Sequence, residues 1–238
     1  MISWEAGAAL VEVAAAGPLL AQQPPATAVE RVKGPPVWLD MDQAELDAAY
    51  DQIKYAPNLP QITKRYATNS EAARSRLGAP RRFAYGPTAI EALDVYATKR
   101  PNAPINVFIH GGAWRVGLAK DYAFPAELFV YAGAHLVVPD FVLVQDAGGS
   151  LMPMADQVRR AVAWVHRNAQ SFGGDPNRIY VSGHSSGGHL AGVVLTTDWR
   201  KEFNLPADTV KGRVVLQRPV RPEGGSPLRT QRVRQVHR

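Results

Sequence analysis

The chain has 238 residues, no cysteine and a formal net charge of +6. This length suits a single domain with a sizeable core, and the lack of cysteine excludes disulfides and thiolate zinc sites. The positive charge is concentrated in residues 218–238, where six arginines stand against Glu223, so residues 1–217 are almost neutral. Because nucleic-acid binding needs a basic patch on the folded domain, the composition argues against that function.

Residues 1–36 predict a leader and linker ahead of the folded domain. The apolar stretch 6–21 is interrupted by Glu12 and Pro18, so it is too short to span a membrane. Its small residues resemble the apolar region of an export signal, but Glu5 stands where such a signal carries positive charge. Two interpretations stand: a degenerate export signal of a periplasmic protein, or an Ala-rich leader of a cytoplasmic one.

Two helices are predicted ahead of the first core strand. The first begins at Asp42, which with Glu45 has the spacing of a capping box, and it runs to about Ile53. Its predicted apolar face consists of Leu46, Ala49, Tyr50 and Ile53. Ser70 is the predicted N-cap of a second, shorter helix that ends at Gly78.

Farther along the chain, predicted strands alternate with predicted helices. The strands are 89–98 (with the alternation of an antiparallel strand), 104–109, 135–139, 178–182 and 212–216. The helices are 120–133, with Phe124, Leu128 and Tyr131 on one face, and 154–169, with Val158, Ala161, Val162 and Val165 at helical spacing. This order predicts an α/β fold with a mostly parallel sheet and helices on both faces.

Residues 183–187, Gly-His-Ser-Ser-Gly, separate the strand 178–182 from a small apolar segment suited to a buried helix. A G-x-S-x-G has chemical meaning as a sharp strand-to-helix turn, which exposes the serine above the sheet in a strained conformation. This context makes Ser185 the candidate nucleophile. The N–H of Ser186, at the helix start, is a candidate donor to a developing oxyanion. The alternative is a Gly/Ser-rich loop before a helix.

A second motif, His110-Gly-Gly-Ala-Trp114, follows directly on the strand 104–109. An HGG run in that position supplies backbone N–H groups to an oxyanion hole, so Gly111 and Gly112 are candidates for that role. Trp114 either lines the substrate pocket or is simply buried. Two such motifs in this order, each at a strand end, favour a serine hydrolase site.

These motifs resemble the α/β-hydrolase superfamily, in its hormone-sensitive-lipase-like esterase branch, and within that branch the kynurenine formamidase (arylformamidase) group. The resemblance covers roughly residues 37–215 and rests on HGGAW at 110–114, VVPDF at 137–141, FGGDPNRI at 172–179, SGHSSGGHLAG at 182–192 and the run 39–52. It implies an α/β-hydrolase that cleaves small-molecule carboxylic esters or aryl formamides without a cofactor, with N-formylkynurenine or a small aryl ester as the substrate. It also implies that segments before the first core strand help to cover the active site, unless they only pack on the core.

Three other polar residues near the motifs have structural roles in this interpretation. The resemblance implies that His110 shapes its own loop and that Asp140, at a strand end, stabilises a loop. Asp175 precedes a proline and is therefore predicted to make a turn. None of the three is expected to attack the substrate.

His184 and His189 flank the candidate nucleophile and invite comparison with a metal site. They lie five residues apart across the turn, without the one-face spacing of paired helical ligands, and no cysteine is available. We therefore predict no metal site and assign His184, together with Trp114, to substrate binding.

The sequence offers no clear catalytic base for Ser185. A serine hydroxyl needs a general base, and in this fold the order is Ser, then Asp or Glu, then His. The acids after Ser185 are Asp198, Glu202, Asp208 and Glu223, and the candidate bases are His189 and His237. His189 is too close to the turn and His237 lies in the Arg-rich tail, so no credible triad is found. Two functions remain: a serine hydrolase impaired for lack of acid and base, or a non-catalytic α/β-hydrolase remnant that at most binds small acyl ligands.

Residues 217–238 depart from the pattern of the resembling family. Pro219 and Pro222 exclude a central strand or a helix. Back-translation of 217–223 is compatible with a shifted frame that encodes Ser-Gly-Leu-Tyr-Asp-Leu-Lys, a run that resembles the related formamidases. We therefore expect an incomplete hydrolase domain, residues 37–216, that ends in an aberrant tail and an open sheet edge, with a natural basic tail as the alternative. The oligomeric state is not indicated.

Overall fold

The computed structural model of the protein describes residues 31–216. The expectations for the leader and for the tail fall mainly on residues 1–30 and 217–238, which lie outside the described part. The chain divides into two compact units, one ending at Leu46 and the next beginning at Asp47. In the first unit, β1 (Pro36–Trp38) pairs antiparallel with β2 (Met41–Asp42). Helix α1 (Gln43–Tyr50) follows directly, and the boundary between the units falls within it.

Asp42 and Glu45 form the predicted capping box at the start of α1. The N–H of Glu45 donates to Asp42 Oδ1 at 2.9 Å, and the N–H of Asp42 donates to Glu45 Oε2 at 3.0 Å. Arg31 also pairs with the buried Asp42 carboxylate at 2.7 Å. This hydrogen-bonded guanidinium holds the pKa of Asp42 well below its usual range.

The predicted course of the first helix is wrong after Tyr50. The helix ends there because the Asp51 side chain caps a new turn, α2 (Gln52–Tyr55), through the N–H of Ile53 at 3.1 Å. Tyr50 and Ile53, expected on an apolar face, are more than half exposed. The spacing was helical, but no residue of α1 is fully buried, and Leu46 and Ala49 on the same face are only half-buried.

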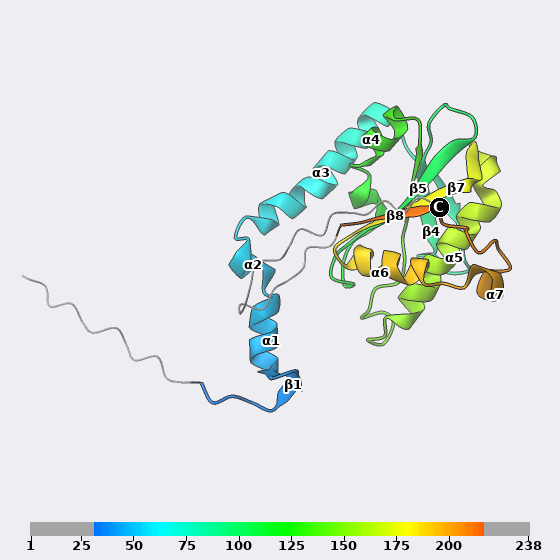
Figure 1. The fold of residues 1–238 in the computed structure, drawn as a ribbon. Coiled ribbons are helices and arrows are strands. Elements are labelled where there is room, and N and C mark those ends of the chain that lie inside the picture. The colour runs from blue at the N-terminus through cyan, green and yellow to red at the C-terminus, as the bar shows by residue number, and fades with distance from the viewer. Residues whose placement is uncertain (1–30, 217–238) are drawn as a thin grey trace, which may run out of the picture. The chain divides into compact units, whose positions relative to one another are not determined.

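The second unit is built around a six-stranded sheet, part of which is labelled in Figure 1. Its strand order is β3-β4-β6-β5-β7-β8. The strands are β3 (Arg81–Ala84), β4 (Ala92–Tyr96), β5 (Ala103–Ile109), β6 (His135–Pro139), β7 (Gly174–His184) and β8 (Gly212–Leu216). β4 pairs antiparallel with β3 and β6, and the other three pairs are parallel. The predicted α/β class is confirmed, including the antiparallel early strand. Over residues 31–216, β8 is an edge strand.

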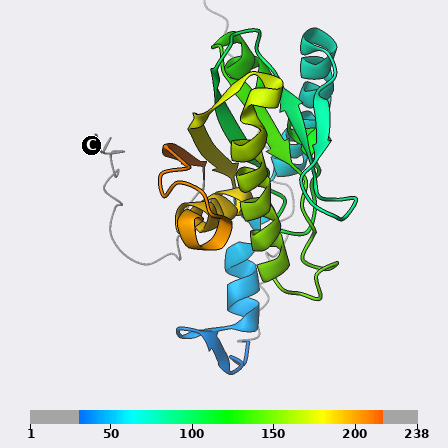
Figure 2. The same cartoon turned by 90° about the vertical axis from the view of Figure 1, so that its right-hand side faces the viewer.

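Helices cover both faces of this sheet (Figure 2). They are α3 (Leu59–Leu77), η1 (Ala119–Tyr122), α4 (Ala126–Tyr131), α5 (Met152–Asn168), η2 (Ala169–Phe172), α6 (Ser186–Leu195) and α7 (Trp199–Phe203). One buried cluster joins the sheet to α5 and α6, and a second joins the opposite face to η1 and α4, with α3 packed against it. The two faces therefore have separate cores.

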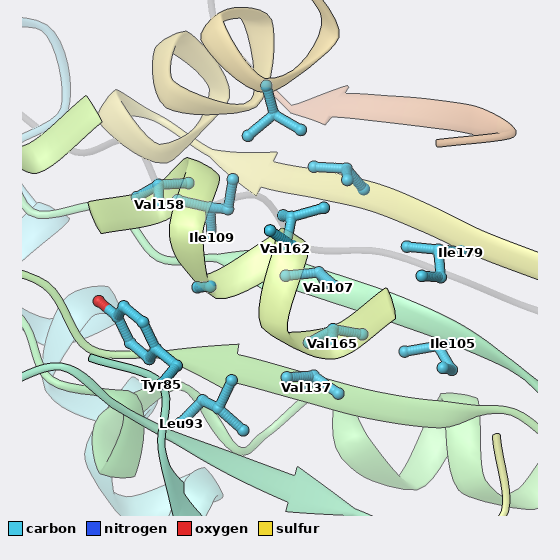
Figure 3. Packing of buried hydrophobic residues seen from close by; sticks show 14 of the residues in the cluster. Tyr85, Leu93, Ile105, Val107, Ile109, Val137, Val158, Val162, Val165 and Ile179 are labelled. Atoms are coloured by element: carbon cyan, nitrogen blue, oxygen red, sulfur yellow. The ribbon is translucent and has the colours of Figure 1, made fainter. Parts of the chain in front are cut away.

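Alternation along β5 shows how one strand serves both cores. Ile105, Val107 and Ile109 belong to the cluster with α5, and Figure 3 shows them beside residues of that helix. Phe108 belongs to the opposite cluster, because successive side chains of a strand point to opposite faces. The predicted apolar stripe of α5 is confirmed: Val158, Ala161, Val162 and Val165 are all buried.

Two helix predictions on the sheet face that η1, α3 and α4 cover are wrong in their bounds or in the role of a residue. The segment 120–133 is split into η1 and α4 around Pro125, so Leu128 and Tyr131 point outward and are 72% and 70% exposed. Ser70 is not an N-cap but lies buried within α3, where its Oγ accepts the N–H of Phe124 at 3.1 Å. The strand β3 was not predicted, because its Arg-Arg-Phe-Ala sequence lacks an apolar pattern. No helix within residues 31–216 has the length and apolarity needed to cross a membrane.

Candidate active site

Ser185 occupies the turn between β7 and α6, as the G-x-S-x-G predicted. Its backbone has φ 55° and ψ −124°, a conformation that costs a non-glycine residue on the order of 1–3 kcal/mol. The flanking glycines are required by close approach: a Cβ on Gly183 would lie 2.2 Å from Gly187 O, and a Cβ on Gly187 would lie 2.1 Å from Ile109 O. The strained turn is therefore confirmed, and its tight packing depends on those two glycines.

The loop 110–118, which we call the HGG loop, follows β5 and lies against this turn. β5 and β7 are parallel neighbours with Ile109 opposite Gly183. Both motifs therefore lie at the carboxyl ends of these two strands. A Cβ on Gly111 would lie 2.7 Å from His184 O and 3.1 Å from Ser185 Cβ. The structure thus brings Gly111 to the candidate nucleophile, as the order of the motifs suggested.

Three backbone N–H groups of the two motifs have no acceptor within residues 31–216. Among the hydrogen bonds of residues 31–216, none is donated by the N–H of Gly111, Gly112 or Ser186. Ser186 is the first residue of α6, where the N–H groups of a helix have no intrahelical acceptor. Free amides of this kind are the chemical requirement for binding a developing oxyanion.

Trp114 connects the HGG loop to the start of α6. Its N–H donates to Ser186 Oγ at 3.3 Å, and its ring meets the ring of His189 edge-on at 5.8 Å between centroids. The side chain is half-buried against the core, and its Nε1 is buried without a hydrogen-bond partner in the described part of the chain. A buried donor without a partner marks a place for a water or a ligand.

His184 directly precedes Ser185 at the end of β7. Its ring meets the ring of Tyr66, from α3, edge-on at 5.7 Å, and its Nδ1 is buried with no partner among residues 31–216. Burial lowers the pKa of His184, so the imidazole is neutral at neutral pH. Sequence analysis missed Tyr66, and the only local signal was a single aromatic residue within a polar helical stretch.

His110 has the structural role that was expected of it. It is almost fully buried and stacks on Phe141 at 4.3 Å and on Tyr122 at 5.0 Å between ring centroids. Its Nδ1 lies 2.9 Å from Gly111 O, so that nitrogen carries the proton and donates. Burial lowers the pKa of His110, so this ring shapes the loop as a neutral group.

Asp140 and Asp175 also have the structural roles expected of them. Asp140 follows β6, and its Oδ1 accepts the N–H of Ala119, one residue beyond the HGG loop, at 2.5 Å. Its Oδ2 pairs with Arg82 at 2.6 Å, a partner that sequence analysis did not identify. Asp175 lies within β7, and its Oδ1 accepts the N–H of Asn177 at 2.9 Å, the local hydrogen bond that Asp makes in turns.

A general base for Ser185 is not found within residues 31–216. The Ser185 hydroxyl makes no hydrogen bond there, and His189 is exposed and packs on Trp114. The candidate acids are engaged elsewhere: Asp198 caps α7, Glu202 pairs with Arg159, and Asp208 pairs with Lys211. Glu223 and His237 lie outside the described residues. The same part of the chain holds no group of three acidic or histidine residues suited to a metal ion.

Comparison with known proteins identifies a family for this chain. Residues 93–214, about half of the chain, match the BD-FAE family profile. A kynurenine formamidase of Danio rerio is 30% identical over 170 residues, which cover 68% of this chain and 56% of that protein. The chain therefore spans less than two thirds of the length of the curated relatives that it matches.

Solved structures show the same fold. A candidate thioesterase from Silicibacter sp. TM1040 is 26% identical with a TM-score of 0.56, and the match covers 63% of this chain and 55% of that one. The carboxylesterase EstE1 from a metagenomic library is 23% identical with a TM-score of 0.51, over 66% of this chain and 53% of that one.

Proposed function

The chain belongs to the BD-FAE family of α/β-hydrolases, and from this premise we propose that it hydrolyses small carboxylic esters or aryl formamides by acyl transfer through Ser185. One observation carries the proposal. The serine stands in a strained turn, and the N–H groups of Gly111, Gly112 and Ser186, which have no acceptor within residues 31–216, lie in the two segments that meet there.

In this reaction Ser185 Oγ attacks the carbonyl carbon of the substrate while a base takes the hydroxyl proton. The carbonyl oxygen becomes an oxyanion, which the N–H groups of Gly111, Gly112 and Ser186 stabilise. The base then delivers the proton to the leaving alcohol or amine, and an acyl-serine remains. Attack by water regenerates the serine and releases the carboxylic acid.

Trp114 and His184 are the proposed contacts with the rest of the substrate. They flank Ser185 from the HGG loop and from β7, and each has a buried ring nitrogen without a partner in the described residues. A substrate group that hydrogen-bonds these nitrogens would remove the free-energy cost of leaving them unpaired, about 1–3 kcal/mol each.

The second candidate function is that of a protein that binds small acyl ligands without turning them over. It is favoured by the absence of a base hydrogen-bonded to Ser185 within residues 31–216. Without a base, a serine hydroxyl at neutral pH is a weak nucleophile. The oxyanion site and the two orphan ring nitrogens would still bind a carbonyl compound.

A fluorophosphonate probe separates the two functions, because it labels only an activated serine. If the chain is a hydrolase, the probe labels wild-type protein but not Ser185→Ala, and the same pair differs in p-nitrophenyl acetate turnover. The matched control is Ser182→Ala, a buried serine of β7 that is bonded to Asn106 Nδ2 at 2.7 Å. Labelling that survives in Ser185→Ala rejects Ser185 as the nucleophile. No labelling of folded wild-type protein favours the binding function.

For the substrate we propose N-formylkynurenine or a small aryl ester, on the similarity to a kynurenine formamidase. Turnover of p-nitrophenyl butyrate without turnover of N-formylkynurenine would instead assign the protein to the general carboxylesterases.

A further inference from the structure

The HGG loop is held in a backbone conformation that it would not keep by itself. Ala113 and Trp114 have φ 52° and 61°, and Gly112 and Gly117 also have positive φ. Non-glycine residues keep such angles only where the surrounding structure holds them. Most of the loop has local or neighbouring partners: Gly112 O accepts the N–H of Val116, and Trp114 O accepts the N–H of Val144.

The exit of the loop is held differently, by a carboxylate from another strand. The N–H of Ala119 donates to Asp140 Oδ1 at 2.5 Å. The backbone of Asp140 is itself fixed, because its N–H donates to Ala92 O at 2.8 Å and its carbonyl accepts the hydroxyl of Tyr85 at 2.5 Å. The side-chain oxygen that faces Ala119 therefore has little freedom as long as the carboxylate itself is held in place.

Arg82, on β3, is the cation that keeps this carboxylate in place. Its guanidinium bonds Asp140 Oδ2 at 2.6 Å and Asp94 Oδ1, on β4, at 2.8 Å. Both carboxylates are buried, with side chains 4% and 6% exposed, whereas Arg82 is 47% exposed. Burial raises the pKa of Asp94, and the nearby Asp140 charge raises it further. Without Arg82, two buried like charges would face each other across neighbouring strands.

From this network we infer that Arg82 is a positioning residue for the HGG loop. By neutralising Asp94 and Asp140 together, it keeps Asp140 on the N–H of Ala119 and so holds Gly111 and Gly112 beside Ser185. The inference rests on the proposed function only in what the loop is for. A purely structural ion pair would join β3 to β4 and leave the loop unaffected, so the two roles predict different measurements.

Amide hydrogen exchange tests the positioning without any need for turnover. In Arg82→Met, which keeps the aliphatic stem, peptides covering residues 110–119 should exchange about tenfold faster, while peptides of β7 change only with global stability. The matched control is Arg81→Met, the neighbouring exposed arginine of β3, which bonds Ser171 O and stacks on Phe83. It should leave exchange at 110–119 unchanged. The inference is overturned if exchange at 110–119 rises equally in both variants, or if it rises in Arg82→Met no more than exchange in β7 does.

A second variant covers the case in which Arg82→Met does not fold. Lysine keeps the charge but cannot bond two carboxylates through a planar fork, so Arg82→Lys should exchange about threefold faster than wild type at 110–119. Exchange at the wild-type rate in Arg82→Lys would also overturn the inference.

Kinetics links the loop to chemistry. If the protein turns over p-nitrophenyl acetate, Arg82→Met should lower kcat about tenfold and change KM by no more than about twofold. The reason is that the N–H groups that stabilise the oxyanion of the transition state are displaced. An unchanged kcat overturns the inference. If exchange at 110–119 rises as expected but no fluorophosphonate labels Ser185, the positioning role is supported and the hydrolase proposal is rejected. Failure of the positioning inference and failure of the proposed function therefore give different results.

Discussion

The turn at Ser185 and the HGG loop lie side by side, but they are held in different ways. The turn is held by backbone packing, because Gly183 lies so close to Gly187, and Gly187 to Ile109, that a Cβ on either glycine would not fit. The loop makes backbone hydrogen bonds of its own, and side chains fix its two ends: the stacked ring of His110 at its start, and Asp140, paired with Arg82, just beyond its end. Changes in the turn should therefore act on folding, and changes around the loop should act on the geometry of the site.

Gly187→Ala should have the largest effect. The added Cβ would lie 2.1 Å from Ile109 O and 2.5 Å from His110 O, and backbone atoms of a central strand cannot move aside cheaply. We expect a loss of about 3 kcal/mol in the free energy of unfolding, measured by urea denaturation.

Gly192→Ala is the control for that change, because it lies in the same helix with nothing within 4 Å of the added Cβ. It should stabilise the protein by up to about 1 kcal/mol through helix propensity. A Gly187→Ala protein as stable as wild type would show that the turn is not held by close packing.

Acid should lower the free energy of unfolding through His110, the first residue of the HGG loop. Its pKa is lowered by burial, so the folded state binds fewer protons than the unfolded state, in which the pKa is about 6.5. The stabilisation is fully present above that pH and is lost as the pH falls below it. The loss is at most about 1.4 kcal/mol per pH unit for each such histidine, and buried His135, whose pKa burial also lowers, adds to it.

Urea denaturation at pH 7.5 and pH 5.5 measures this dependence. His110→Gln should show a smaller loss of stability between the two pH values than wild type does. His189→Gln, at an exposed position, should lose as much as wild type. Equal losses in all three proteins would mean that His110 is not a source of the acid sensitivity.

Ser185→Gly should have the smallest effect on stability, and the opposite sign. Glycine relieves the strain of φ 55°, so we expect a gain of about 1 kcal/mol in the free energy of unfolding, with loss of fluorophosphonate labelling. Ser185→Ala keeps the Cβ and hence the strain, so it should lose labelling without that gain. Equal stability of the two variants would contradict stored strain at this position.

Features that depend on neighbours in the chain were predictable from the sequence. The glycines of G-x-S-x-G and of HGG are needed at fixed offsets from a strand end, so the turn and the loop were located by residue number. The apolar stripe of α5 repeats at helical spacing, and the capping box joins Asp42 to Glu45, three residues later. The α/β class followed from the order of such segments.

The tertiary structure decided what those segments meet. Ser70 was predicted to be an N-cap, but α3 begins earlier, at Leu59, and contains it. Leu128 was predicted to lie on an apolar face, but Pro125 separates η1 from α4 and Leu128 is exposed. Arg82 and Asp140 are 58 residues apart, and β3 carries no apolar pattern that would place them together. Pairings between distant polar side chains depend on which strands become neighbours, and no local period in the sequence encodes that choice.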